Sequence, residues 1–388
     1  MLNDSKLFFD FRLFARAVFN CTEGWLFGFI CKNYLVCRHL MIGSKGMADL
    51  VDENNGALRC RSYPVIWLSL SLIIFLLVFF QIPGEAPDWQ SYDRFFNLLL
   101  IDGLDVLVTS RAEPGFVIVS FFLTELFSSN LAVFGVIAAS AIFLKCWAIN
   151  QFSSSRLVFL VIMLFYLIRF APLHELTQVR AACSTSFMVI AFVLSWRGNR
   201  IGGVVACAAA LAFHLCAIII IPLVLLLQLR SRFTQALSLK TVITVSVVVF
   251  ITTLFAVKPA VNYLQDSFMV IAMYQAVGFG YVAPNPFSAA LLLDWGMIIG
   301  GLVMWGRLPS MMKYVLLLEI IGMAIFYASM DFAVIAHRYR EYFAVLWVFF
   351  VAQGLQQRTP VKEVSILFVI ASIALYSYLF FFSGKFFS

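Results

Sequence analysis

The stretch RFAPLHELTQVR, residues 169–180, interrupts a long run of apolar sequence and decides how the chain folds. Apolar residues lie on both sides of it, and the apolar sequence after it reaches AFH at residues 212–214. A charged side chain at the centre of a bilayer costs about 3 kcal/mol. So dense a polar segment therefore marks either a loop at the membrane surface or a functional site, and the sequence leaves both readings open.

The composition is that of a membrane protein. Of the 388 residues, 63% are hydrophobic and 12% are charged, whereas soluble domains carry about 25% charged residues. Only helices and closed barrels satisfy their backbone hydrogen bonds in lipid. Continuous apolar runs such as LSLSLIIFLLVFFQI, residues 68–82, lack the alternation of barrel strands. We therefore predict an all-α integral membrane protein.

Several function classes lack support in the sequence. The net charge is +7, but no basic block of the kind that follows nucleic-acid phosphates occurs, so no nucleic-acid partner is expected. The eight cysteines are scattered without a CxxC pair, which argues against a disulfide framework and against a zinc site. Neither a phosphate loop nor an HExxH motif is present.

About eleven transmembrane helices are predicted from runs of roughly 20 apolar residues. They are residues 63–82, 131–149, 157–170, 181–196, 201–213, 215–229, 241–257, 288–305, 314–330, 342–355 and 364–383. The apolar piece Gly115–Phe127 is too short to cross and is predicted to be re-entrant or interfacial. Residues 1–62 form a separate basic and aromatic region, cytoplasmic or interfacial, ahead of the membrane domain 63–388.

The basic residues predict the orientation. By the positive-inside rule, the cytoplasmic loops are QFSSSR (151–156), RGNR (197–200), RSRFTQALSLK (230–240), RLPSMMK (307–313) and QQRTPVKE (356–363). The outer side then collects the polar segments 83–130, 169–180, 258–287 and 331–341. His214 is expected on the same side, at the tip of a helical hairpin.

Arginines on the outer side are the first candidate site residues, because a guanidinium group binds phosphate through two parallel hydrogen bonds. They are Arg169, Arg180, Arg338 and Arg340. An anionic ligand would account for them, and so would pairing with Glu175, Glu341 or Asp331.

Carboxylates on this side could take a proton from an acceptor hydroxyl in glycosyl chemistry. They are Asp88, Asp93, Glu113, Glu175, Asp294, Asp331 and Glu341, and their spacing does not choose among them. His214 is either a base or a packing histidine. Tyr92 could stack on a sugar ring or anchor the chain at the interface.

Five short motifs in this order resemble the EpsG/Wzy group of bacterial polysaccharide polymerases. They are DWQSYDRFF (88–96), EPGF (113–116), QVRAA (178–182), AFH (212–214) and HRYREYF (337–343). The resemblance covers about residues 63 to 355. It departs from the family where an Arg-Gln pair is usual, because here Gln178 precedes Arg180 by two positions.

The resemblance implies an integral-membrane glycosyltransferase of GT-C-like polymerase architecture. Such an enzyme joins oligosaccharide repeat units carried on undecaprenyl diphosphate, at the periplasmic face of the bacterial inner membrane. The implied partners are this lipid-linked oligosaccharide, the bilayer and a chain-length regulator protein, with no cofactor and no metal. The expected catalytic residues are Glu113, His214 and Asp88, and the expected substrate-binding residues are Arg180, Arg169, Gln178, Arg338, Arg340 and Tyr92.

Other membrane functions remain as alternatives. An O-antigen ligase or another lipid-linked-sugar transferase would share the outward polar loops. A polysaccharide flippase should carry charges in mid-helix, and the sequence predicts almost no charged residues at those positions. A membrane O-acyltransferase would use a histidine deep in a span, a role that His214 could fill.

Overall fold

A computed structural model describes residues 63–80, 88–110, 112–229, 284–330 and 332–381, with isolated helical positions between 244 and 259. These residues form helices and turns, without a strand among them, as predicted. The region 1–62, much of the expected span 241–257 and nearly all of 258–283 lie outside the described residues. The division of the chain at residue 62 stays a prediction.

Helices of spanning length and composition are fewer than the sequence predicts. In the described part of the chain, four helices are long and apolar enough to cross a membrane: Asn130–Asn150, Val179–Trp196, Ser310–Ala328 and Val361–Phe380. Four shorter apolar helices are α3 (Pro64–Phe79), α6 (Pro114–Leu126), α11 (Arg200–Phe213) and α16 (Ala289–Val303). The protein is therefore an all-helical membrane protein, and the count of eleven spans stays a prediction.

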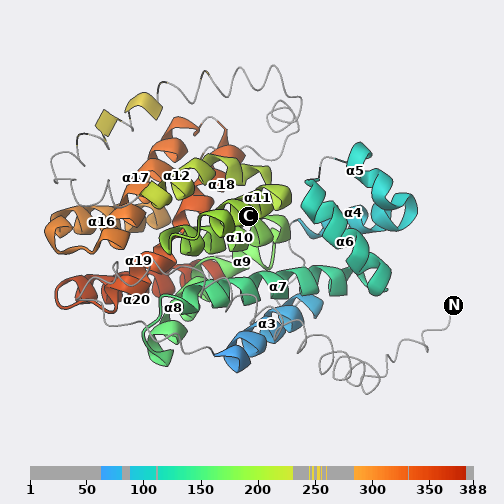
Figure 1. Cartoon of the computed structure of the whole chain (residues 1–388), viewed down its shortest axis with the longest axis horizontal. Helices are drawn as coiled ribbons and strands as arrows, with labels where there is room; N and C mark the ends of the chain where they lie inside the picture. Colours follow the sequence, from blue (N-terminus) through green and yellow to red (C-terminus); the bar gives the residue numbers. More distant parts are fainter. Residues whose placement is uncertain are drawn as a thin grey trace. The chain divides into compact units, whose positions relative to one another are not determined.

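Helices α3 and α7 (Asn130–Asn150) run side by side (Figure 1). Pro64 starts α3, where a missing N–H costs nothing, and the side chain of Ser129 caps α7 by accepting a hydrogen bond from the N–H of Ala132. Trp67 lies on the buried face of α3, whereas Val65 and Leu72 are exposed. An exposed apolar face on a membrane helix is suited to contact with lipid.

The polar stretch at residues 169–180 is not a surface loop. It forms the break between α8 (Arg156–Arg169), the short α9 (Ala171–His174) and α10 (Val179–Trp196). Arg169, His174 and Glu175 are all buried. Of the two readings that the sequence leaves open, the surface loop is excluded for these three residues, because each side chain faces polar groups of other helices.

Helix α11 packs closely on α10 along its alanine-rich face. Ala206 and Ala210 are buried, and the hydroxyl of Ser184 in α10 donates to the carbonyl of Ala210 at 2.8 Å. The span expected at 215–229 is broken into η4 (Leu215–Ile219), α12 (Ile221–Leu226) and η5 (Leu227–Leu229). Pro222 lacks the N–H that a continuous helix would need there, and it opens a new helix instead.

Two segments expected as polar loops are helical. The first, after residue 83, contains α4 (Trp89–Asp102), η3 (Gly103–Asp105) and α5 (Val106–Thr109) before α6. The second, 331–341, lies mostly in α18 (Ala333–Ala344). The remaining helices are η6 (Trp305–Arg307), α17 (Ser310–Ala328), α19 (Trp347–Gly354) and α20 (Val361–Phe381). Apolar content alone misses α4 and α18 because both carry many polar residues.

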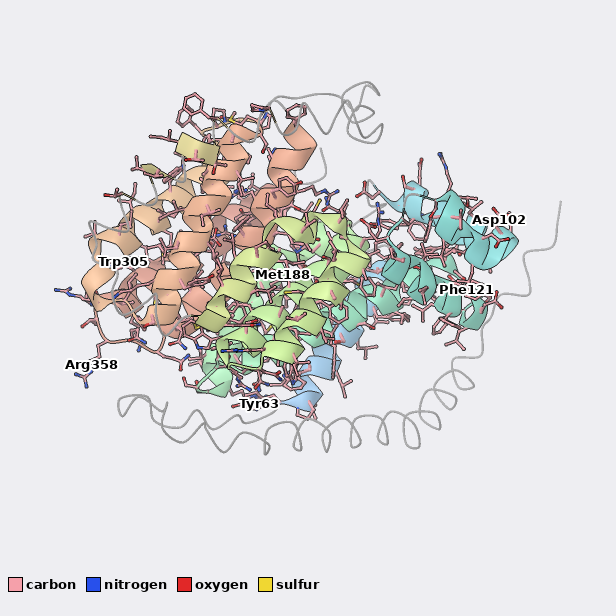
Figure 2. All side chains as sticks on the ribbon, turned by 45° about the horizontal axis from the view of Figure 1, so that its top comes forward. Tyr63, Asp102, Phe121, Met188, Trp305 and Arg358 are labelled. Atoms are coloured by element: carbon pink, nitrogen blue, oxygen red, sulfur yellow. The ribbon has the colours of Figure 1, made fainter. Side chains whose placement is uncertain are left out.

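Three of the predicted cytoplasmic loops, 151–156, 197–200 and 356–363, lie together at one end of the helices. The side chain of Gln356 donates to the carbonyl of Phe152 at 2.7 Å, and Arg197 donates to that of Gln151 at 3.4 Å. Figure 2 shows Trp305 and Arg358 at this end, with Asp102 and Phe121 at the other. The grouping of these three loops is confirmed, the predicted loop 230–240 lies outside the described residues, and the compartment that each end faces stays a prediction.

Candidate functional site

The EPGF motif places a carboxylate where several helices meet. Glu113 is the residue before α6, Pro114 is its first residue, and Gly115 lies against the end of α11. A Cβ atom at residue 115 would lie 2.8 Å from the carbonyl oxygen of Ala212. Glycine therefore allows an approach that brings Glu113 beside the end of α11.

Glu113 contacts three donors, two of them on side chains far away in sequence. Its Oε2 accepts from Arg180 at 3.1 Å, and its Oε1 lies 3.0 Å from Nδ1 of His214. Oε1 also accepts from the backbone N–H of Leu215 at 3.1 Å. We call Glu113, Arg180 and His214 the Glu113 site.

The Glu113 site is ionised at neutral pH. Burial by itself would raise the pKa of Glu113, but His214, Arg180 and the N–H of Leu215 outweigh it and lower the pKa to about 2. Burial would lower the pKa of His214, but the neighbouring Cys216 and Glu113 raise it to about 9. Between these two values Glu113 is a carboxylate and His214 an imidazolium.

Arg180 is the second residue of α10 and rests on aromatic rings. Its guanidinium carbon lies 6.0 Å from the ring centre of Tyr92 and 5.9 Å from that of Phe116. Its side chain is 34% exposed, so the residue is partly accessible from outside the protein. The partner considered from the sequence, Glu175, does not contact it; Glu113 does.

A looser group of charges lies beside the Glu113 site. Arg338 of α18 is 3.9 Å from Oδ2 of Asp88 and 4.0 Å from Oε2 of Glu341. The same Glu341 oxygen is 3.9 Å from Nε2 of His174. The ring of the next residue, Tyr342, meets that of His214 edge-on at 6.2 Å. Of the two late arginines, Arg338 is therefore the one that faces the Glu113 site.

The structure does not bring Arg169 and Arg340 into the Glu113 site. Both guanidinium groups pair with the buried Asp294 of α16, one with each carboxylate oxygen. The Arg169 guanidinium also lies 5.1 Å from the ring centre of Phe170 and 5.2 Å from that of Tyr376. We call Arg169, Asp294 and Arg340 the Asp294 cluster, and a ligand could reach Arg169 only by breaking it.

Sequence reasoning missed a second buried ion pair. The ammonium group of Lys145 in α7 lies 2.5 Å from Oε1 of Glu175, and the hydroxyl of Tyr166 donates to the same carboxylate at 2.8 Å. Lys145 is fully buried within α7. A lone lysine in an apolar span was the available signal, and its partner lies 30 residues away.

Gln178, another predicted substrate-binding residue, lies beside the Glu113 site in sequence. Gln178 directly precedes α10, two positions from Arg180, and its Oε1 is buried without a hydrogen-bond partner. Among the described residues, no group of three or more His, Cys, Asp or Glu side chains is placed to hold a metal ion. That catalysis needs no metal stays a prediction.

Comparison with known proteins supports the resemblance seen in the motifs. No curated protein and no solved structure matches the chain. One family model does match, and it covers residues 65–388. This range includes all of the Glu113 site, α18 and the Asp294 cluster. The chain therefore belongs to the EpsG family, a family of Wzy-type polysaccharide polymerases.

Proposed function

We propose that this EpsG-family protein is an O-antigen or polysaccharide polymerase that joins undecaprenyl-diphosphate-linked oligosaccharide repeat units. We place the reaction at the periplasmic face of the bacterial inner membrane. The observation that carries the proposal is the convergence of Arg180, the protonated His214 and Arg338 on one region, at the start of α10. A diphosphate is the part of the substrate that such a group suits best.

The diphosphate is the leaving group of this reaction, so its negative charge grows as the glycosidic bond breaks. Fixed cationic donors that face the developing charge lower the barrier. The first turn of α10 adds backbone N–H groups, of which that of Arg180 donates to the hydroxyl of Tyr92 at 3.5 Å, and the positive end of a helix dipole. Arg180 lies in that turn, and its side chain is partly exposed.

Glu113 acts in this proposal as a positioning residue and not as the proton acceptor. A base works best when its pKa lies near the working pH, and a carboxylate with a pKa of about 2 is a weak base. Its contacts hold Arg180 and His214 in place and keep His214 charged. Asp88 is more exposed and lies near Arg338, which suits contact with the substrate.

Tyr92 also takes a different part from the sugar stacking considered from the sequence. Its ring is buried and packs edge-on against Phe116 and Phe134, with centre distances of 5.9 and 5.2 Å. A buried ring cannot lie against a sugar. Tyr92 instead supports the guanidinium of Arg180, and through it the diphosphate.

The alternatives differ in their acceptors and in their use of charges inside helices. Mid-helix positions do carry charged residues, because Lys145 and Glu319 lie inside α7 and α17 and Asp294 inside α16. The expectation of almost no mid-helix charge is therefore wrong and does not weigh against a flippase. A ligase would use the same diphosphate contacts and differ only in its acceptor, so the products decide between ligase and polymerase.

The test is repeat-unit polymerisation by the purified full-length protein with undecaprenyl-diphosphate oligosaccharide as the sole sugar substrate and a chelator present. We expect a ladder of polymer lengths and release of undecaprenyl diphosphate. A single transfer to an added acceptor without a ladder would favour a ligase. No transfer at all by folded protein would refute the proposed function, and a strict need for a divalent ion would refute the metal-free mechanism.

A further inference from the structure

A second polar group, next to the Glu113 site, contains buried atoms without hydrogen-bond partners. Both ring nitrogens of His174 are buried and unpartnered, as are Oε2 of Glu341 and one terminal nitrogen of Arg338. The side chain of His174 is 1% exposed and that of Glu341 is 16% exposed. Buried polar atoms nearly always have partners, so several together call for a ligand group.

The distances define what that group can be. The Glu341 Oε2 is 3.9 Å from Nε2 of His174 and 4.0 Å from the Arg338 guanidinium. These separations exceed a direct hydrogen bond, whose length is about 2.7 to 3.2 Å. One oxygen atom placed between two such groups can lie within hydrogen-bonding distance of both. A hydroxyl group, which donates to a carboxylate and accepts from a cation or an imidazole N–H, fits this arrangement.

We infer that Glu341, assisted by His174, binds the attacking hydroxyl of the acceptor sugar and takes its proton. The inference rests on the proposed polymerase function and adds the acceptor side of that reaction. As the proton moves to Glu341, the hydroxyl oxygen forms a bond to the anomeric carbon of the donor sugar. The bond from that carbon to the diphosphate oxygen breaks, and its electron pair leaves with undecaprenyl diphosphate beside Arg180.

The charges around Glu341 support this division of work. Burial raises the pKa of Glu341. The charges of Arg338, Arg340 and His214 lower this pKa and that of Asp88 raises it, and the resulting value is about 7. Burial, helped by the charges of Lys145 and Arg338, lowers the pKa of His174 well below its usual value. His174 is therefore neutral, and Glu341 is a far stronger base than Glu113.

The experiment compares Glu341→Gln with Glu363→Gln, which removes an exposed carboxylate on α20 near the opposite end. Polymerisation is followed from pH 5 to 10 with saturating donor, and binding of undecaprenyl diphosphate is measured alongside. Wild-type protein and Glu363→Gln should gain rate up to about pH 7. Glu341→Gln should lose about 100-fold or more in kcat. Its pH–rate profile should lack the acidic limb, which is the rise in rate as Glu341 is deprotonated in the wild type. It should bind undecaprenyl diphosphate as the wild type does.

Each other outcome overturns the inference. A kcat for Glu341→Gln within tenfold of wild type, or an acidic limb that stays in place, would show that another group takes the proton. A parallel loss of undecaprenyl diphosphate binding would make Glu341 structural. If Glu341→Gln does not fold, Glu341→Asp is measured instead, and we expect a smaller loss in kcat and an acidic limb moved to lower pH. An unchanged kcat with an unmoved acidic limb would overturn the inference. Wild-type protein that forms no polymer refutes the proposed function itself, which is a separate result.

Discussion

The Glu113 site and the Asp294 cluster are built from the same chemical groups and differ in access. Each joins a carboxylate to two cationic side chains. In the Asp294 cluster the side chains are 1%, 2% and 14% exposed for Arg169, Asp294 and Arg340, whereas Arg180 is 34% exposed. A closed cluster can only stabilise the fold, while an open one can also bind a ligand.

The difference shows that an arginine between apolar spans does not by itself mark a binding site. Arg169 is surrounded by aromatic rings and by Asp294, so its charge is neutralised within the protein. Arg180 contacts Glu113 and Tyr92 while a third of its side chain stays exposed. We therefore expect substitutions in the two regions to fail in different ways.

The largest effect is expected from Asp294→Asn. It leaves two buried guanidinium groups without their counter-charge, which costs about 3 to 5 kcal/mol of stability. Thermal unfolding of the purified protein, together with the folded yield from membranes, measures this loss. The matched control is Asp102→Asn, which changes an exposed carboxylate at the end of α4 and should leave stability unchanged. Equal stability of the two variants would remove the distinction between closed and open clusters.

The next largest effect is expected from Arg180→Lys, and it should appear in the rate. The change keeps the charge but loses the planar fork, and each fixed donor to a developing charge is worth about 2.7 to 4 kcal/mol. We expect polymerisation to fall a hundredfold or more in protein that remains folded.

Arg169→Lys, made in parallel, should instead lower the unfolding temperature, because Arg169 belongs to the closed cluster. Near-normal polymer formation by Arg180→Lys would refute its role as a diphosphate ligand.

A smaller and pH-dependent effect is expected from Glu113→Gln. The Glu113 carboxylate helps to hold the pKa of His214 near 9, so its loss should bring that pKa down and leave His214 neutral at pH 8. Binding of undecaprenyl diphosphate at pH 8 should then weaken roughly tenfold, with a much smaller change at pH 5.5. An equal loss at both pH values would mean that Glu113 acts through something other than the charge of His214.

The smallest perturbation, single cysteines in a cysteine-free background, tests which end of the molecule is which. Ser91 and Asn285 are exposed positions in the predicted periplasmic segments, and Ser154 is an exposed position in a predicted cytoplasmic loop. A membrane-impermeant thiol reagent should label the first two from the periplasm and not the third. Labelling of the first two only from the cytoplasm would place the Glu113 site on the wrong side for the proposed reaction.

Much of the fold could be predicted from hydropathy. Helices near 130–150, 179–196 and 200–213 have bounds within two residues of the predicted ones, because long apolar runs with few charges have one stable state in lipid. Helices α4 and α18 could not be recognised in this way. Arg340 and Glu341 of α18 face α16 and α9, whereas Ser91 and Asp102 of α4 are exposed. Hydropathy identifies neither helix, because both are rich in polar residues.

The candidate site was predictable as a set of residues but not as a geometry. The motifs singled out Glu113, Arg180 and His214, and the structure brings these three together. The arginines expected on the outer side also included Arg169 and Arg340, which belong to the Asp294 cluster. Which arginine pairs with which carboxylate depends on contacts such as that of Arg169 with Asp294, 125 residues apart, and a single sequence carries no record of those contacts.

The close approach of α6 to α11 has a consequence for how the reaction could be lost. Gly115 bears no functional group, yet its lack of a side chain sets how near Glu113 comes to His214. Even the methyl group of an alanine would press on the Ala212 backbone. The distance between the charged groups of the Glu113 site thus depends on a residue that has no functional group of its own. A survey that ranks residues by reactivity would pass over the position that keeps the reactive ones in register.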